Sequence, residues 1–306
     1  MHARIRDLPF DPASLHSLSA GLITSHHQNN YVGAVKRLNE IRTRLATTAF
    51  ATVPGFQLNG IKREELIATN SMLLHELYFG SLGGDGLTME PAAKLMLQAS
   101  FGSTVRWREE FIACAKALSG GSGWVLLVFQ PREGTLVNQW AADHTHAVAG
   151  GVPILALDMY EHAYHSDYGA AAGAYVDAYM GNIDWAAVYG RYQRAVHAAS
   201  EAYGAGQDEI DDALVLDVRR AGVFDQARTL IPGARWCDPA HVAAWSAELP
   251  ADRELIVYCV YGHELSRATA MRLRAAGLNA RYLRGGIDSW QAAGRTLVDK
   301  PAPATP

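Results

Sequence analysis

Two side chains that commonly bind metals lie four residues apart where a buried strand is expected to end. Asp158 and His162 follow the apolar run 152–157, which is typical of such a strand. If the chain turns into a helix there, both side chains project from one face. A carboxylate oxygen and a neutral imidazole together suit iron or manganese. A carboxylate at a buried strand end also needs a partner. Spacing alone is equally consistent with an ordinary polar pair at a helix start.

The segment 157–164 resembles the ligand segment of the iron/manganese superoxide dismutases, whose pattern runs Asp-x-x-Glu-His-Ala-Tyr. Upstream, the segment 25–39 resembles that family's first helix without a gap, with a double histidine, a valine and a closing Leu-Asn. This register implies that His26 is a metal ligand and that His27 is its neighbour. On general exposure statistics a lone histidine pair is otherwise polar surface.

A second histidine segment lies in the expected helix 64–79. His75 stands among Met and Leu residues and is followed by Tyr78 and Phe79. Such a histidine must satisfy its ring nitrogens, and a core histidine bonded to the backbone would do so equally well. The family has a His-x-x-Tyr-aromatic segment here, which implies that His75 is a ligand and Tyr78 its neighbour.

Residues around the metal are also implied by the resemblance. The segment Gly-Ser-Gly-Trp ending at Trp124 matches a family strand whose Trp lines the metal pocket, although a purely structural core role fits as well. The family places a glutamine near the metal-bound solvent. One candidate position is occupied by Ser71, and the other falls in segment 143–146, where we expect His144 to take this role.

Two departures from the family pattern bear on turnover. Ala34 stands where the family has a gateway tyrosine, and Asn30 stands where it has a histidine. Both put proton delivery in question without affecting metal binding. Tyr31 is too few residues from His26 to take the same place on the helix.

The resemblance covers about residues 8–200 and implies that superoxide is disproportionated to oxygen and hydrogen peroxide at one Fe or Mn ion. The implied ligands are His26, His75, Asp158 and His162. Glu161 and Tyr164 match the family's dimer contacts, in which the glutamate reaches the metal-binding histidine of the partner subunit. A homodimer or higher homo-oligomer is therefore expected, although a solvated glutamate is the ordinary state of such a residue.

A cysteine in the C-terminal third could carry separate chemistry. Cys259 follows the apolar strand 255–258 and precedes a helical stretch. A thiol near a helix N-terminus receives backbone N–H groups and the positive dipole end, which favours the thiolate. A buried inert cysteine is the alternative.

This region resembles the rhodanese domains over about residues 208–298. The resemblance is carried by Leu216–Arg219, by the Cys-x-x-Gly loop at Cys259 and by Gly285–Trp290. It implies that the cysteine accepts a sulfane sulfur and passes it on as a persulfide. The loop is one residue longer than the commonest form and Glu264 replaces a frequent arginine. The sulfur donor and acceptor, and a redox-sensing role, therefore stay open.

The elements that position these residues follow from periodicity. A long helix is expected over 22–45, a polar turn at 60–63 before the second helix, and further helices over 91–115. A strand reaching residue 129 and a hairpin turn at 131–134 lead to the strand that ends at Asp158. After an expected linker at 202–207, short apolar strands alternate with helices, which predicts a parallel sheet. The tail 300–306 is expected to be disordered.

The predicted fold class is α+β. A helical hairpin (1–88) and a mixed α/β metal-binding domain (89–202) are followed by a small α/β rhodanese-like domain with a parallel sheet (208–300). The chain of 306 residues is long enough for separate cores.

Composition restricts the partners. A net charge of −4 gives no electrostatic reason to expect nucleic acid. The N-terminal segment lacks the apolar run of a signal peptide, and no segment approaches the length of a membrane helix. Three widely spaced cysteines argue against a disulfide framework and for a reduced, cytoplasmic protein.

Two rival functions remain. In one, the departures at Asn30, Ala34 and Ser71 mark a metal-binding or interaction module with weakened catalysis. In the other, sulfur transfer is the main activity and the first domain is an oligomerising scaffold. Retention of all four ligand types favours the enzyme, because a scaffold has no need of them.

Overall fold

The computed structural model describes residues 2–118, 121–146, 149–210 and 212–301. By their contacts these residues form two compact units, each described by itself. The first comprises Met1–Glu90, Arg108–Val128 and Asn138–Tyr189, and the second comprises Pro91–Trp107, Phe129–Val137 and Gly190–Pro306. Among the described residues, none of the helices combines the length and the apolar character needed to cross a membrane.

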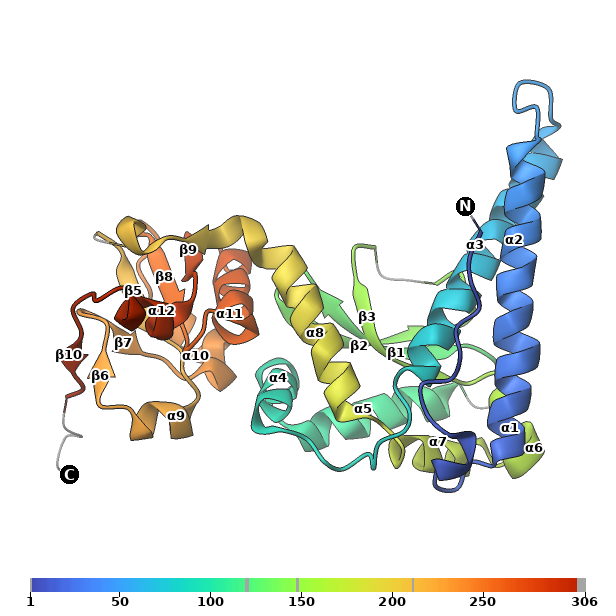
Figure 1. The fold of residues 1–306 in the computed structure, drawn as a ribbon, viewed down its shortest axis with the longest axis horizontal. Helices are drawn as coiled ribbons and strands as arrows, with labels where there is room; N and C mark the ends of the chain where they lie inside the picture. Colours follow the sequence, from blue (N-terminus) through green and yellow to red (C-terminus); the bar gives the residue numbers. More distant parts are fainter. Residues whose placement is uncertain (1, 119–120, 147–148, 211, 302–306) are drawn as a thin grey trace. The chain divides into compact units, whose positions relative to one another are not determined.

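The first unit begins with a helical hairpin (Figure 1). Helix α1 (Ala20–Ser25) passes into a π-helical segment (His26–Tyr31) and then into α2 (Val32–Ala46), which packs along α3 (Gly55–Phe79). The hydroxyl of Ser19 caps α1 by accepting a hydrogen bond from the Leu22 N–H at 3.0 Å. The predicted helix over 22–45 is confirmed, with a π-helical segment that periodicity does not reveal.

The start of the second helix was predicted wrongly. Helix α3 begins at Gly55, directly after Pro54, so the expected polar turn at 60–63 lies inside it. A single interior glycine such as Gly60 costs a helix only about 1 kcal/mol relative to alanine. Packing along α2 over many turns offsets that cost, so the helix continues through it.

The following elements agree with expectation. Strand β1 is buried from Trp124 to Phe129, and the three strands form a sheet in the order β2-β1-β3. Asp158 ends β3, and a 3₁₀ turn (Glu161–Ala163) follows it instead of an α-helix. The bounds are α4 (Pro91–Phe101), α5 (Thr104–Ala117), β1 (Trp124–Gln130), β2 (Thr135–Ala141), β3 (Val152–Asp158), α6 (His165–Tyr168), α7 (Ala172–Met180) and α8 (Trp185–Ser200).

The C-terminal region is built on a five-stranded sheet in the order β4-β9-β8-β5-β7, and all of its neighbouring strands are parallel. The predicted parallel sheet is confirmed. Helix α11 packs on β8 and β9. The bounds are β4 (Gly204–Ala205), β5 (Leu214–Asp217), α9 (Ala221–Gln226), β6 (Thr229–Leu230), β7 (Arg235–Trp236), α10 (Val242–Ser246), β8 (Leu255–Tyr258), α11 (Glu264–Ala275), β9 (Ala280–Leu283), α12 (Gly286–Ala292) and β10 (Val298–Asp299).

The expected linker at 202–207 is part of this fold. Strand β4 lies within it and pairs with β9, so the polar and small residues there form a sheet edge. At the other end, the Lys300 ammonium donates to the Phe224 carbonyl at 2.8 Å. The rest of the predicted disordered tail, residues 302–306, lies outside the described residues.

Candidate functional site

Four predicted ligands converge in the first unit, each from a different element. Their nearest ligand atoms all lie within 4.8 Å of one another. The Asp158 Oδ2 atom is 3.1 Å from Nε2 of His26, 3.6 Å from Nε2 of His75 and 3.2 Å from Nε2 of His162. The π-helical segment, α3, the end of β3 and the 3₁₀ turn after it supply these residues in chain order.

The three distances from Asp158 Oδ2 to the histidine nitrogens fit ligands of one metal ion. An ion bonded at about 2.1 Å to two ligands about 90° to 120° apart separates them by about 3.0 to 3.6 Å. His75 Nδ1 bonds the Ser71 carbonyl at 2.6 Å, so Nε2 presents a lone pair. Within the described part of the chain, that buried Nε2 has no hydrogen-bond partner. A cation at the centre would satisfy it.

The protonation states also suit a metal. Burial alone would raise the pKa of Asp158, but hydrogen bonds from His162 and His26 outweigh it and hold the pKa below its usual range. Burial lowers the pKa of His75 to about 3. At neutral pH the site therefore offers a charged carboxylate and an unprotonated His75, which are the states that bind metal ions.

Trp124 and His144 form a pair beside the ligands. The fully buried Trp124 donates from Nε1 to His144 Nδ1 at 2.8 Å, and its ring meets the His75 ring edge-on at 5.3 Å. The His144 ring lies 6.3 Å from the His75 ring. Burial lowers the pKa of His144, so this imidazole is neutral at physiological pH.

The sequence interpretation missed Tyr160, which lies between two histidines. Its ring is stacked on His144 at 4.8 Å and on His162 at 5.4 Å, with interplanar angles of 18° and 17°. Its backbone N–H donates to Asp158 Oδ1 at 2.8 Å. Its position between two predicted metal ligands in the sequence was the available signal.

Tyr78 is buried against the site together with a second residue that the sequence interpretation missed. The Tyr78 ring lies 5.0 Å from the His26 ring, and its hydroxyl lies 3.3 Å from that of Tyr175. Tyr175 donates to the Asp158 carbonyl at 2.8 Å, and Tyr179, one turn along α7, donates to the Ala156 carbonyl at 2.6 Å. Two tyrosines four residues apart on an apolar helix were the signal for this contact.

Ala34, which stands where the family has a gateway tyrosine, and the nearby Tyr31 are both buried. Ala34 is buried on α2, and Tyr31 is buried with its hydroxyl turned to Glu76, to which it donates at 3.0 Å. The Tyr31 hydroxyl also accepts from the Arg6 N–H at 2.9 Å. The Tyr31 hydroxyl is therefore hydrogen-bonded to both Arg6 and Glu76.

One ligand is more exposed than the rest. The His162 side chain is 27% exposed, whereas those of His26, His75 and Asp158 are at most 1% exposed. Glu161 beside it is exposed, and Tyr164 is buried with its ring stacked on Tyr175 at 5.3 Å. The exposure of the ligand group is thus concentrated at His162, next to Glu161 in the chain.

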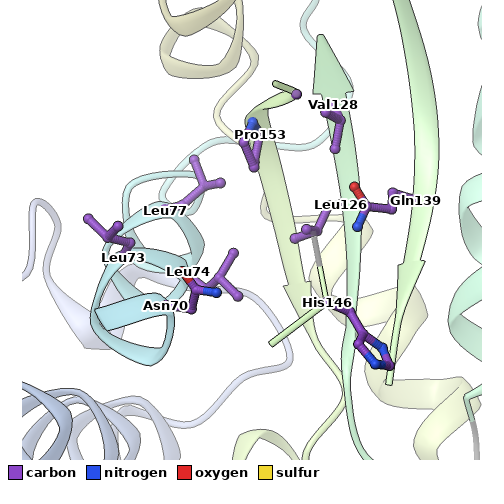
Figure 2. Close-up of a pocket in the computed structure, with 10 residues that line it drawn as sticks. Asn70, Leu73, Leu74, Leu77, Leu126, Val128, Gln139, His146 and Pro153 are labelled. Carbon is purple, nitrogen blue, oxygen red and sulfur yellow. The ribbon is translucent and has the colours of Figure 1, made fainter. Parts of the chain in front are cut away.

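A separate pocket lies near the ligand helix α3. It has a volume of about 330 Å³, and Figure 2 shows leucines of α3 on one side and residues of the sheet on the other. Asn70 in its wall bonds the His144 carbonyl at 2.5 Å. The predicted site residues do not line it. The residues that do are Asn70, Leu73, Leu74, Leu77, Leu126, Val128, Gln139, His146, Gly151 and Pro153.

Cys259 lies in the second unit, in the loop between β8 and α11. It is buried, and its Sγ lies 3.3 Å from the hydroxyl of Ser266 in the first turn of α11. Glu264 accepts a hydrogen bond from Gln193 at 3.2 Å. The thiol therefore contacts the first turn of the helix that the sequence predicts after it.

The glycine motif before Trp290 supports this cysteine loop. Gly286 has a φ of +58°, and a Cβ there would lie 2.4 Å from the Cys259 carbonyl oxygen. The N–H of Ile287 donates to that oxygen at 3.0 Å. The start of α12 can approach the loop this closely only without a side chain at Gly286.

The other motif of this region forms a buried ion pair. Arg219 bonds both carboxylate oxygens of Asp217, with Nε at 3.0 and 2.9 Å, and the Tyr258 hydroxyl donates to the same carboxylate at 2.8 Å. These contacts join β5 to β8 beneath the cysteine loop and explain why the charged residues are buried together.

Comparison with known proteins identifies both regions. Residues 89–191 match the family described as iron/manganese superoxide dismutases, C-terminal domain, and residues 201–293 match the rhodanese-like domain.

Curated relatives cover the first region. An iron superoxide dismutase of Cupriavidus metallidurans is 60% identical over 192 residues, which are 63% of this chain and 97% of that protein. A manganese superoxide dismutase of Halobacterium salinarum is 35% identical, over 61% of this chain and 94% of that protein. An iron superoxide dismutase of Aquifex pyrophilus is 34% identical, over 61% and 90%. The chain belongs to the iron/manganese superoxide dismutases, and a rhodanese-like domain is joined to it.

Proposed function

We propose that this protein disproportionates superoxide to oxygen and hydrogen peroxide at one Fe or Mn ion held by His26, His75, Asp158 and His162. The observation that carries the proposal is the convergence of these side chains around a buried His75 Nε2 with no partner among the described residues. Family membership supplies the reaction. A bound Fe or Mn ion would supply the one-electron redox chemistry that superoxide disproportionation needs.

The chain's own residues prepare the site for this reaction. Asp158 would contribute the negative charge that stabilises the more oxidised ion. Trp124 Nε1–H bonds His144 Nδ1, so the neutral His144 carries its proton on Nε2. That N–H is a hydrogen-bond donor that would orient solvent or substrate beside the ligands. The buried rings of Trp124 and Tyr78 exclude bulk water from the ligands.

The test uses the full chain, with metal content measured by mass spectrometry and superoxide decay measured by pulse radiolysis. We expect one Fe or Mn per chain. Loss of most metal and a fall in decay rate of about a hundredfold or more are expected in His75→Ala. His27→Ala is the matched control, because His27 bonds the Arg6 carbonyl instead. Full metal content and normal decay in His75→Ala would refute the assignment.

We further propose that the active form is a homodimer in which Glu161 reaches His162 of the partner and Tyr164 supports the contact. The support is the uneven exposure of the ligand shell. Only His162 among the four ligands is open to solvent, at 27%, and the exposed carboxylate of Glu161 lies beside it in the chain. A partner surface would complete the burial of the site.

We also propose a cytoplasmic location, which the three free cysteines support. A further proposal is that Cys259 acts as a sulfur carrier. The thiolate attacks the outer sulfur of a persulfide donor, forming a Cys259 S–S bond as the donor's S–S bond breaks and its thiolate leaves. Burial raises the pKa of Cys114 and of Cys237, so these thiols are poor nucleophiles. We assign this role to a rhodanese-like domain of residues 208–300, and the dismutase to segments 1–88 and 89–202.

Incubation with cysteine persulfide, followed by peptide mass spectrometry, tests the carrier role. We expect one added sulfur on Cys259, none in Cys259→Ser, and an unchanged result in the control Cys114→Ser. Superoxide decay should be normal in Cys259→Ser. Sulfur found equally on Cys114 and Cys259 would refute a specific carrier site.

A further inference from the structure

Helix α11 of the rhodanese-like domain presents a cation to residues that precede that domain. The Arg272 guanidinium donates through Nε to the Gly134 carbonyl at 2.9 Å and through Nη1 to the Ala99 carbonyl at 2.8 Å. Its Nη2 donates to the Ser100 hydroxyl at 3.1 Å. The acceptors lie in the β1–β2 turn and in α4, and they belong to the same compact unit as α11.

The acceptors form a site that suits a guanidinium. Desolvation of the buried Arg272 guanidinium lowers its pKa, and no carboxylate among the described residues forms an ion pair with it. A desolvated cation is costly unless its N–H groups find acceptors. Ala99 lies in the last turn of α4, where carbonyls lack helical partners and carry the negative end of the helix dipole. Arg272 therefore caps α4 from another domain.

The β1–β2 turn approaches α11 so closely at Gly134 that a side chain at this position would clash with the helix. Gly134 has a φ of +66°, and a Cβ there would lie 2.8 Å from the Met271 Cβ and 2.9 Å from the Ala268 carbonyl oxygen. Ser100 also accepts from the Leu136 N–H at 3.0 Å, so its hydroxyl joins α4 to β2 as well as to Arg272.

The N-terminal end of α11 has contacts of the same kind with α8. Gln193 donates to Glu264 at 3.2 Å, and Arg267 donates to the Ser200 hydroxyl at 3.3 Å. Residues that precede the rhodanese-like domain thus hold α11 at its start and again two turns later.

We propose that the face of α11 formed by Ala268, Met271 and Arg272, here called the docking face, is an interaction surface for the C-terminal end of α4 and the β1–β2 turn. The groups that this face binds are two neutral main-chain carbonyls, of Ala99 and Gly134, and the Ser100 hydroxyl. The rhodanese-like domain is therefore fixed to these dismutase segments, and they open together as one cooperative unit.

Native-state hydrogen exchange of the full chain in increasing urea tests this directly. If the docking face holds, the slowest amides of α4 and of α11 exchange through the same opening, with equal opening constants and equal urea dependence. An α11 that opens at lower urea while α4 stays protected would overturn the proposal. This measurement needs no variant.

Substitution identifies the residue responsible. In Arg272→Met, exchange in segments 91–101 and 129–137 should rise about tenfold or more, because three hydrogen bonds are lost. Arg132→Met, an exposed change in the same turn, is the matched control and should leave exchange unchanged. A folded Arg272→Met chain with wild-type exchange in both segments would refute the docking face.

The Ser100 contact gives a second, independent measurement. Ser100→Ala removes the Leu136 contact as well, so its effect is compared with and without Arg272→Met in a double-mutant cycle. We expect the combined rise in exchange to be smaller than the product of the single rises. Effects that simply multiply would show that the two side chains do not interact and would overturn this part of the proposal.

Discussion

The proton on His144 is fixed by Trp124. An indole N–H only donates, so Nδ1 of His144 must accept and the neutral ring must carry its proton on Nε2. The ring is also held by stacking on Tyr160 at 4.8 Å. Its orientation and its donor are therefore both set before any substrate arrives.

We predict that His144→Ala keeps its metal but slows superoxide decay by about tenfold to a hundredfold, because a residue beside the ligands has been lost. The optical or paramagnetic spectrum of the loaded protein should shift as well. His144→Gln restores an N–H donor and should recover part of the rate. Unchanged decay and spectrum in His144→Ala would mean that another residue orients the solvent.

The metal-free protein should lose stability in mild acid. Burial lowers the pKa of His75 to about 3, so between about pH 6.5 and pH 3 the unfolded chain binds a proton that the folded chain does not. This proton uptake favours unfolding as the pH falls, by a maximum on the order of 4 kcal/mol. Urea unfolding of metal-free protein at pH 7 and pH 5 measures it.

The comparison for this prediction is His75→Leu, which cannot take up the proton. Its stability should fall less than that of the wild type over the same pH interval. Equal losses in the two proteins would show that His75 is not the group responsible.

At the scale of elements, α7 holds the end of β3 through two tyrosines. Tyr175 bonds the Asp158 carbonyl and Tyr179 bonds the Ala156 carbonyl. Each substitution to Phe removes a buried hydrogen bond to a carbonyl and should lower the free energy of unfolding by about 1 to 3 kcal/mol. Only Tyr175→Phe should also weaken metal affinity, since only Tyr175 contacts a ligand residue.

Tyr179→Phe is thus the control for Tyr175→Phe, one helical turn away on the same face. Calorimetry gives the stability of both, and competition with a chelator gives the metal affinity. Equal metal affinity in the two variants would show that the hydroxyl of Tyr175 supports the fold alone.

The four ligands could be predicted because each lies in a short motif with its neighbours intact. Asp158 and His162 were expected to meet across a helix, yet they meet across a strand end and a 3₁₀ turn, because four residues bring the side chains together in either case. The start of α3 was missed because Gly60 and its polar neighbours resemble a turn locally. Its helical state depends on packing against α2, which local composition does not contain.

Across the whole molecule, the parallel sheet of the rhodanese-like domain was predicted from alternating strands and helices, and the comparisons confirm that domain. The contacts of Arg272 could not be predicted. They join residues about 138 and 173 positions apart, and their acceptors are main-chain oxygens that every residue type carries. A sequence pattern can indicate a side-chain acceptor by its residue type, but it cannot indicate which main-chain carbonyl will accept a hydrogen bond.

Subunit association should depend on Glu161. We predict that Glu161→Ala weakens a homodimer about tenfold or more, because a carboxylate is lost beside the exposed ligand His162. Metal affinity should fall with it. Sedimentation at low protein concentration measures the first effect. Glu109→Ala, at another exposed glutamate, is the control. An unchanged dimer constant would exclude this contact.

The π-helical segment determines where a one-residue deletion in this helix can be tolerated. Inserting one residue into an α-helix turns everything beyond it by about 100° and misplaces the packed face. The wider π turns between His26 and Tyr31 keep an additional residue without interrupting the helix, as the bond from the Val32 N–H to the His27 carbonyl shows. A deletion of one codon within this segment can therefore convert the π turns to α-helix while α2 keeps its packing, whereas a deletion elsewhere in the helix would rotate the packed face.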